Sequence, residues 1–161
     1  MGQRVKIHLL RHAEAEEFVS SDAARGLTSQ GLAQAARVGD FLLRIGQPLD
    51  LIVASPYLRT LQTAQTVANK LGNVPLLEDR RMVCGMSPST GLGLIREHSA
   101  SNNILLVGHQ PDLSHLAASL LSRDRSLDVE FSTGSLLSLT LERAEAGAGI
   151  LDSFIHVKQM G

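Results

Sequence analysis

Residues 5–15 read VKIHLLRHAEA, an aliphatic run that ends in an arginine followed by a histidine. Valine, isoleucine and leucine dominate residues 5–10, and this composition is typical of a buried strand. Arg11 and His12 follow directly, where the strand would leave the sheet. Ligands of open α/β sheets bind beyond the carboxyl ends of the strands. We therefore expect Arg11 and His12 to lie in a functional crevice.

Two other apolar runs end in the same way. LDLIVAS (49–55) leads into Ser55-Pro56, and NILLVGH (103–109) leads into Gly108-His109. Because parallel strands have their carboxyl ends at one edge of a sheet, these polar residues should meet Arg11 and His12 there.

Helical patterns alternate with these strands. Thr28 can cap a helix whose apolar residues, Leu32, Ala35, Ala36, Phe41 and Leu42, recur at helical spacing. Ser55-Pro56 indicates the start of a second helix that runs to Leu71, because proline is favoured at the first helical position. A modest helix is expected at 94–98 and another from Pro111 to about 121.

The remaining strands complete the predicted fold. VPLLED (74–79) is a short extended piece, and 135–142 with 150–157 should form a hairpin. Strands that alternate with helices predict a three-layer α/β/α sandwich with a mostly parallel central sheet. We expect one domain over residues 1–161, since this length fits a single core.

The composition excludes several classes of partner. Hydrophobic residues make up 43% and charged residues 19%, with a net charge of −1, so neither nucleic acid nor a membrane surface is indicated. No apolar stretch is long enough to span a membrane. The single cysteine, Cys84, allows no internal disulfide and points to a reducing, cytoplasmic location.

The polar residues at the strand ends are suited to a multiply charged anion. Arg59 lies in SPYLRTLQTAQ (55–65), in the expected first turn of a helix, and His109 precedes another helix N-terminus. Free N–H groups at helix N-termini attract anions, and arginine matches the oxygens of phosphate. Together with Arg11 and His12 they predict a phosphate site.

Three motifs together resemble the histidine phosphatase superfamily, the clan of phosphoglycerate mutases and histidine acid phosphatases. They are the RH pair at 11–12, the SPxxRTxQTA run from Ser55 and the GHxP run from Gly108. RxLTxxG, from Arg25 to Gly31, is most similar to the SixA-type phosphohistidine phosphatases. The likeness extends from residue 5 to about 157.

The resemblance implies a role for each residue. His12 would be the nucleophile that forms a phosphohistidine intermediate, and Arg11, Arg59 and His109 would neutralise the transferring phosphoryl group. Substrate contacts are expected from Arg25, Ala13 and Gln110. No metal or other cofactor is expected, because the arginines supply the positive charge.

This sequence departs from the family pattern in two places. Ala13 stands where relatives have glycine in RHG, and the acidic, tryptophan-containing context of the general acid is missing. Glu78 and Asp79 are the remaining candidates for the acid. Among phosphorylated substrates, phosphohistidine depends least on a general acid. Its leaving group is a neutral imidazole, whereas a phosphate ester of an alcohol releases an alkoxide.

The sequence therefore predicts a phosphatase in signal transduction that acts on a phosphorylated protein such as a phosphotransfer domain. Two alternatives remain: a small-molecule phosphomonoesterase with Glu78 or Asp79 as the acid, and a non-catalytic phosphoprotein-binding module. His8 shares strand parity with His12, but without a third ligand of suitable spacing we expect it to be packed rather than metal-bound.

Overall fold

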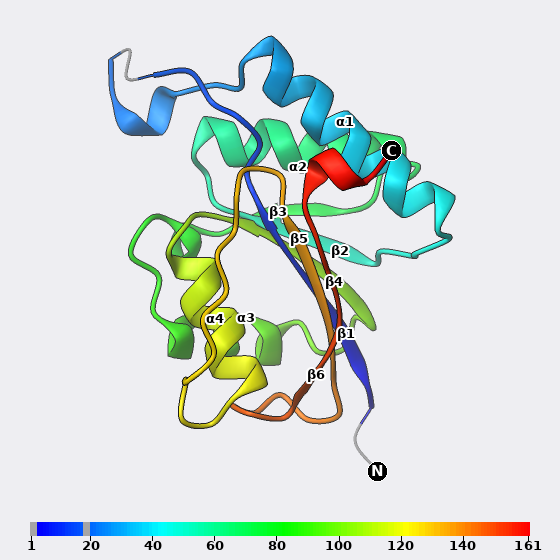
Figure 1. Cartoon of the computed structure of the whole chain (residues 1–161), viewed down its shortest axis with the longest axis vertical. Coiled ribbons are helices and arrows are strands. Elements are labelled where there is room, and N and C mark those ends of the chain that lie inside the picture. The colour runs from blue at the N-terminus through cyan, green and yellow to red at the C-terminus, as the bar shows by residue number, and fades with distance from the viewer. Residues whose placement is uncertain (1–2, 18–19) are drawn as a thin grey trace.

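A computed structural model of the chain describes residues 3–17 and 20–161. At its centre lies a six-stranded sheet with the order β3-β2-β4-β1-β5-β6 (Figure 1). β3, β2, β4 and β1 are parallel, whereas β5 runs antiparallel to both β1 and β6. The strands are β1 (Val5–Arg11), β2 (Leu51–Ala54), β3 (Leu76–Glu78), β4 (Asn103–Gly108), β5 (Leu136–Leu141) and β6 (Gly149–Ile155).

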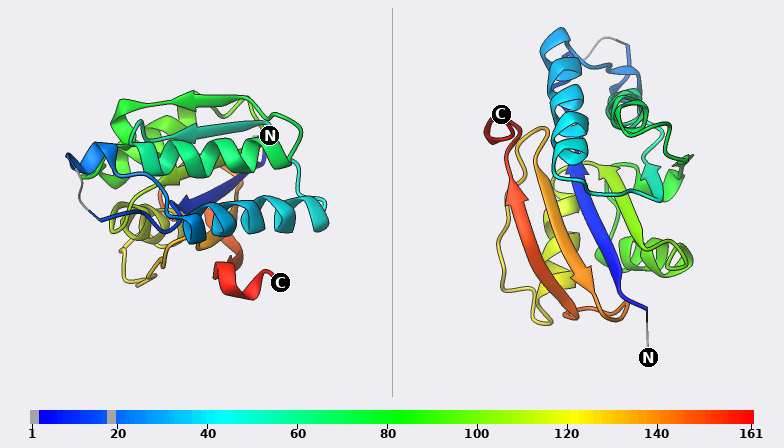
Figure 2. Two further views of the ribbon diagram at one scale, coloured as in Figure 1. Left: turned by 90° about the horizontal axis from the view of Figure 1, so that it is seen from above. Right: turned by 90° about the vertical axis from the view of Figure 1, so that its right-hand side faces the viewer.

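Two pairs of helices cover the two faces of this sheet (Figure 2). The helices are α1 (Ser29–Arg44), α2 (Leu58–Lys70), α3 (Pro88–Glu97) and α4 (Asp112–Leu121). α1 packs against α2, and α3 packs against α4. Three short 3₁₀ helices accompany them: η1 (Asp22–Ala24), η2 (Arg80–Met82) and η3 (Val157–Gln159). The predicted α/β fold, with a mostly parallel sheet between layers of helices, is confirmed.

The residues of β1 alternate between two hydrophobic cores, as the period of a strand requires. Ile7 and Leu9 pack with the α3 and α4 side, whereas Leu10 packs with the α1 and α2 side. All three are fully buried. A strand with both faces covered needs apolar residues at consecutive positions, which explains the unbroken aliphatic run of 5–10.

α1 begins as the sequence predicts, but its buried face is different. Thr28 is the N-cap, and its hydroxyl accepts a hydrogen bond from the Gly31 amide at 2.9 Å. Leu32 was expected in the core yet is 45% exposed. The buried stripe instead comprises Gly31, Ala35, Val38, Gly39 and Leu42. Two glycines therefore occupy positions where the helix approaches its neighbours closely.

Two predicted helix starts are wrong. α2 begins at Leu58 rather than at Pro56, with Tyr57 as its N-cap, and the Ser55 hydroxyl contacts a histidine beyond β4. α3 begins at Pro88, six residues before the expected start at Leu94, and is capped by Ser87. The glycines that suggested a loop there include Gly91, where a Cβ would lie 2.9 Å from both Leu116 methyl groups. Gly91 therefore permits close packing of α3 on α4.

Candidate active site

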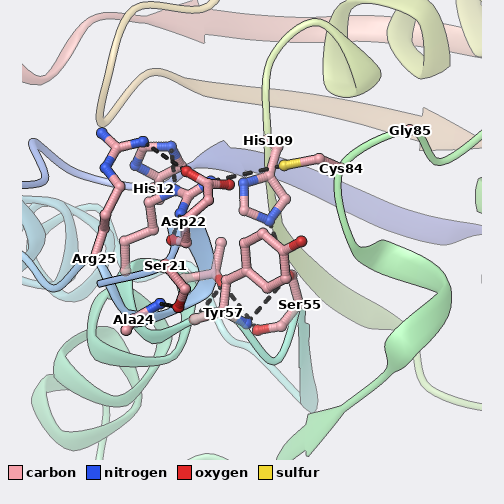
Figure 3. Close-up of polar contacts among 12 residues, drawn as sticks. His12, Ser21, Asp22, Ala24, Arg25, Ser55, Tyr57, Cys84, Gly85 and His109 are labelled. Atoms are coloured by element: carbon pink, nitrogen blue, oxygen red, sulfur yellow. Dashed lines mark hydrogen bonds and ion pairs between the residues drawn. The ribbon is translucent and has the colours of Figure 1, made fainter. Parts of the chain in front are cut away.

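The carboxyl ends of β1, β2 and β4 bring four predicted residues together. Arg11 is in register with Gly108, and the His12 amide donates to the Gly108 carbonyl at 3.1 Å. The ring centroids of His12 and His109 are consequently 5.6 Å apart. Ser55 and Tyr57 come from the segment between β2 and α2, and Tyr57 meets the His109 ring edge-on (Figure 3).

His12 is held as a neutral imidazole with one free nitrogen. Its Nδ1 lies 2.7 Å from the Ala13 carbonyl oxygen. A carbonyl can only accept, so Nδ1 carries the hydrogen and Nε2 carries the lone pair. The pKa of His12 is lowered to about 4, mainly by burial; the Ala13 hydrogen bond opposes this shift, and the charges of Arg59 and Arg11 contribute to it. Nε2 is therefore available as a nucleophile at neutral pH.

Arg59 donates a hydrogen bond to that unprotonated nitrogen. It is the second residue of α2, is only 3% exposed, and its Nε lies 3.3 Å from His12 Nε2. Its two Nη groups turn towards η1, where Nη1 donates to the Asp22 carbonyl at 2.8 Å and Nη2 to the Asp22 carboxylate at 3.1 Å. One edge of the guanidinium is thus fixed by η1, while the other is directed at the histidine.

Arg11 and Arg25 add further positive charge. Arg11 donates from Nη1 to the Phe131 carbonyl at 2.8 Å, and its buried Nε has no hydrogen-bond partner among the described residues. Burial and the neighbouring charge of Arg59 lower the pKa of Arg11. Arg25 donates to the Glu16 carbonyl and pairs with Asp22 at 3.0 Å. Like charges held this close favour an anion between them.

His109 is positioned by a hydroxyl. Its Nε2 lies 2.8 Å from Ser55 Oγ, which also accepts a hydrogen bond from the Tyr57 amide at 3.3 Å. Its buried Nδ1 has no partner within residues 3–17 and 20–161. Burial, followed by the charges of Arg59 and His12, lowers the pKa of His109 to about 3. His109 is therefore neutral and can offer a hydrogen-bond donor rather than a charge.

Ala13 and Gln110, the other predicted substrate contacts, are engaged by hydrogen bonds within the protein. The backbone of Ala13 is fully engaged: its carbonyl binds His12, and its amide donates to Thr63 Oγ1 at 3.1 Å. Gln110 binds Ser114 through its amide group and lines a groove of about 830 Å³ beside α4.

Glu78 and Asp79 lie at the β3 edge of the sheet. Glu78 is exposed, and no hydrogen bond or ion pair in the described part of the chain joins either carboxylate to His12 or Arg59. Asp79 instead caps η2 and pairs with Arg81 at 2.6 Å. Hydrogen bonds from Arg81 lower the pKa of Asp79, so it is ionised at neutral pH and holds no proton to donate.

Sequence reasoning missed several residues that shape the site. Asp22 and Cys84 both contact Arg59, the latter with its Sγ 3.7 Å from Nη2. Ser55 was expected at this edge of the sheet and lies there, but its contact with His109 was not predicted. Thr63 carried one usable signal, since it lies one helical turn after Arg59 on the same face of α2. The contacts of Asp22 and Cys84 cross 37 and 25 residues, and no local pattern reveals them.

No cluster of metal-ligating side chains is found in the part of the chain that the structure describes. Groups of three or more His, Cys, Asp or Glu at suitable positions are lacking there. His8 is buried, and its Nδ1 contacts Ser138 Oγ at 2.7 Å, so it is packed in the core as expected. The described helices also include none long and apolar enough to cross a membrane.

Comparisons with known proteins agree with this geometry. The model of the histidine phosphatase superfamily (branch 1) matches residues 7–83. Phosphohistidine phosphatase SixA of Escherichia coli is 26% identical over 151 residues, which are 90% of this chain and 89% of that protein. A protein of Picosynechococcus sp. is 30% identical over 125 residues, 72% of this chain and 73% of its own.

A solved structure of the protein histidine phosphatase SixA, complexed with tungstate, shares the fold. It superposes with a TM-score of 0.88 at 20% identity, covering 98% of this chain and 100% of that one. The fold and the site define an α/β enzyme with a histidine at the carboxyl edge of its sheet. The chain belongs to the histidine phosphatase superfamily and is a histidine-based phosphatase, as the three motifs predicted.

Proposed function

We propose that this enzyme removes the phosphoryl group from phosphohistidine on a signalling phosphotransfer protein, through a covalent intermediate on His12. One observation carries the proposal: His12 Nε2 is unprotonated on a neutral ring and accepts a hydrogen bond from Nε of the buried Arg59 guanidinium at 3.3 Å. A neutral nucleophile beside fixed positive charge suits attack on an anionic phosphoryl group.

The reaction would proceed in two transfers. His12 Nε2 attacks phosphorus, the bond between phosphorus and the leaving group breaks, and the hydrogen stays on Nδ1, which donates it to the Ala13 carbonyl. Water then attacks the phosphohistidine, the electron pair returns to Nε2, and phosphate leaves. The short Nδ1 contact stabilises His12 whenever phosphorylation makes its ring cationic, because a charge-assisted hydrogen bond is stronger than a neutral one.

The surrounding donors would stabilise charge on the phosphoryl oxygens. Arg59 Nε contacts the nucleophile directly, and the buried Nε of Arg11 has no partner among the described residues. His109 Nδ1 adds a donor when the Ser55 hydroxyl hydrogen binds Nε2. Phosphoryl transfer relies on positioning and electrostatic stabilisation, which these groups supply. For Ala13 we propose only the backbone contact with His12. For Gln110 we propose only a contact with the periphery of the substrate.

Phosphohistidine is favoured over phosphate esters by the lack of a placed acid. An alkoxide leaving group needs a proton as it departs. Asp79 is ionised and bound to Arg81, and Glu78 is exposed at the β3 edge of the sheet, so we assign the role of the acid to neither. A phosphoimidazole already protonated on its other nitrogen leaves as neutral imidazole and needs none. The name of the Escherichia coli relative agrees with this substrate.

The proposed partner is a cytoplasmic protein. One cysteine in 161 residues is typical of a protein in a reducing compartment. There the enzyme would encounter phosphotransfer proteins of signalling pathways. The whole chain would act as one phosphatase domain.

The test is phosphate release from a phosphohistidine-bearing phosphotransfer domain, measured without added metal and beside a simple aryl phosphate. Wild type should release phosphate rapidly from the protein and slowly from the ester. His12→Ala should release none above background, while the control His98→Gln, at the end of α3, should match wild type.

Two other results would replace the proposal. Equal or faster turnover of the ester would identify a general phosphomonoesterase. Phosphate binding without release from either substrate would identify a phosphoprotein-binding module.

A further inference from the structure

Asp22 brings a negative charge to the edge of the positive site. Its carboxylate bridges two arginines, with Oδ2 3.1 Å from Arg59 Nη2 and Oδ1 3.0 Å from Arg25 Nη1 (Figure 3). Its own backbone carbonyl accepts from Arg59 Nη1. The Asp22 side chain nevertheless remains 50% exposed. A carboxylate has about four lone-pair positions, so this one can accept further hydrogen bonds from the solvent side.

The Arg59 guanidinium connects the Asp22 carboxylate to the nucleophile. Arg59 contacts His12 Nε2 with its Nε and Asp22 with its Nη2. A phosphoryl group that reaches Nε2 would therefore meet Arg59, whose other edge is bound by Asp22. A leaving group displayed on another protein must approach from solvent, where the Asp22 side chain is half exposed.

A carboxylate in this place opposes the binding of ordinary phosphate esters. It repels the phosphoryl dianion and occupies donors of Arg59 and Arg25 that could otherwise bind phosphate. Hydrogen bonds from Arg25 and Arg59 lower the pKa of Asp22, so the negative charge is present at neutral pH. Only a substrate with a positive charge or a strong donor at its leaving group would gain from it.

We propose that Asp22 selects phosphoimidazolium substrates by accepting a hydrogen bond from the ring nitrogen that does not carry phosphorus. This inference rests on the proposed function and identifies the residue that gives it specificity. A phosphohistidine protonated on that nitrogen bears a positive ring and an N–H directed away from phosphorus. Phosphate esters of alcohols, phenols and sugars carry no such cation.

The transfer balances without an external acid. The bond from His12 Nε2 to phosphorus forms as the substrate N–P bond breaks, and the electron pair of that bond remains on the substrate nitrogen. The other substrate nitrogen keeps its hydrogen, bound to Asp22, so histidine leaves neutral. In the second step the water oxygen joins phosphorus, the electron pair returns to His12 Nε2, and both water hydrogens leave on dihydrogen phosphate.

Asp22→Asn tests this inference, because asparagine keeps the size and the backbone contact but loses the charge. We expect kcat/KM for the phosphohistidine protein to fall about 10- to 100-fold, the usual effect of losing a hydrogen bond to a charged group. For the aryl phosphate, kcat/KM should stay equal or rise, since a repulsive charge has gone. Glu17→Gln, which removes an exposed carboxylate of the same loop, should change neither value.

A purely structural role would give a different result. If Asp22 only holds Arg59 and Arg25 in place, Asp22→Asn lowers kcat/KM for both substrates by the same factor, and the inference is overturned. Unchanged values for both substrates overturn it equally. Should the asparagine variant fold poorly by circular dichroism, Asp22→Ser is judged by the same ratio of the two substrates.

Failure of the proposed function would be recognised separately, in wild type alone. Wild-type enzyme that does not dephosphorylate the phosphotransfer domain refutes the function before any variant is compared. Wild-type enzyme that does so, with an unchanged substrate ratio in Asp22→Asn, refutes only the role of Asp22.

Discussion

The two ring nitrogens of His109 have different surroundings, and this difference decides what the residue can donate. Nε2 contacts Ser55 Oγ, whereas Nδ1 is buried without a partner among the described residues. Ser55 Oγ already accepts from the Tyr57 amide, so its own hydrogen is free for Nε2. That arrangement leaves the ring hydrogen on Nδ1, where a phosphoryl oxygen could accept it.

Ser55→Ala should therefore impair catalysis more than folding. Without the hydroxyl, His109 loses the group that fixes its tautomer, and we expect kcat to fall about tenfold or more, as for other lost transition-state donors. The free energy of unfolding should fall by about 1–2 kcal/mol, because two buried groups lose their partner. Steady-state phosphate release and urea unfolding measure the two effects.

A second buried serine–histidine pair provides the control. Ser138 contacts His8 Nδ1 at 2.7 Å, on β5 and β1 away from the strand ends. Ser138→Ala should lose comparable stability and keep wild-type kcat. Equal kcat losses in both variants would show that Ser55 acts through folding alone.

At the scale of elements, the start of α1 is fitted to the segment that follows His12. A Cβ on Gly31 would lie 1.9 Å from the Glu14 carbonyl oxygen. The Thr28 amide donates to that same oxygen at 3.1 Å, and the Thr28 hydroxyl donates to the Glu14 carboxylate at 2.9 Å. The first turn of α1 thus holds the chain just after the nucleophile.

Gly31→Ala should consequently destabilise the protein despite the high helix propensity of alanine. The added methyl group forces backbone to move, and we expect a loss of about 1–3 kcal/mol in the free energy of unfolding, as for other overpacked sites. Gly93→Ala on α3, where a Cβ meets nothing within 4 Å, should instead gain about 0.5–1 kcal/mol. Thermal unfolding of both variants, measured side by side, tests the prediction. A stabilised Gly31→Ala would contradict the packing.

Elements were predictable from sequence where local chemistry decides them. The aliphatic runs of β1, β2 and β4, and the Thr28 cap of α1, rest on residues close together in the chain. The polar residues at the ends of these strands then predicted that His12, Arg59 and His109 lie together, because the carboxyl ends of parallel strands lie at one edge of the sheet. The start of α2 was not predictable, since the Ser55 hydroxyl contacts His109 from a distant segment. The start of α3 did carry a local signal, Ser87 followed by Pro88, but the glycines around it suggested a loop instead.

The charges around the site were harder to predict than its nucleophile. Asp22 lies in a 3₁₀ turn capped by Ser21, and nothing in that local pattern indicates a pairing with Arg59. Asp79 was a candidate acid only because it follows β3, and its pairing with Arg81 gives it a structural role. Side-chain direction in loops depends on tertiary contacts, which the sequence alone does not record.

At the scale of the whole molecule, three buried histidines make folding sensitive to acid. Burial is the main cause that lowers the pKa of His8 and of His12 to about 4 and that of His109 to about 3. In the unfolded chain each should titrate near 6.5. Between about pH 6.5 and pH 4 the unfolded chain therefore binds protons that the folded protein does not. Stability must fall as the pH falls through that window.

His8 isolates this effect because it lies away from the catalytic edge of the sheet. Its pKa is lowered mainly by burial and further by Lys6, while Asp152 opposes the shift. We expect wild type to lose stability between pH 7.5 and pH 4.5, with His8 contributing on the order of 2–3 kcal/mol. His8→Gln, which cannot bind the proton, should show a decline smaller by that amount, whatever its stability at pH 7.5.

Urea unfolding at the two pH values measures the difference, and His115→Gln is the matched control. His115 is exposed on α4, so its replacement should leave the pH dependence as in wild type. If His8→Gln and wild type lost equal stability on acidification, His8 would have to bind its proton equally well in both states. Burial against β5, with Nδ1 on Ser138 and Nε2 without a partner in the described residues, would then be a wrong description of its surroundings.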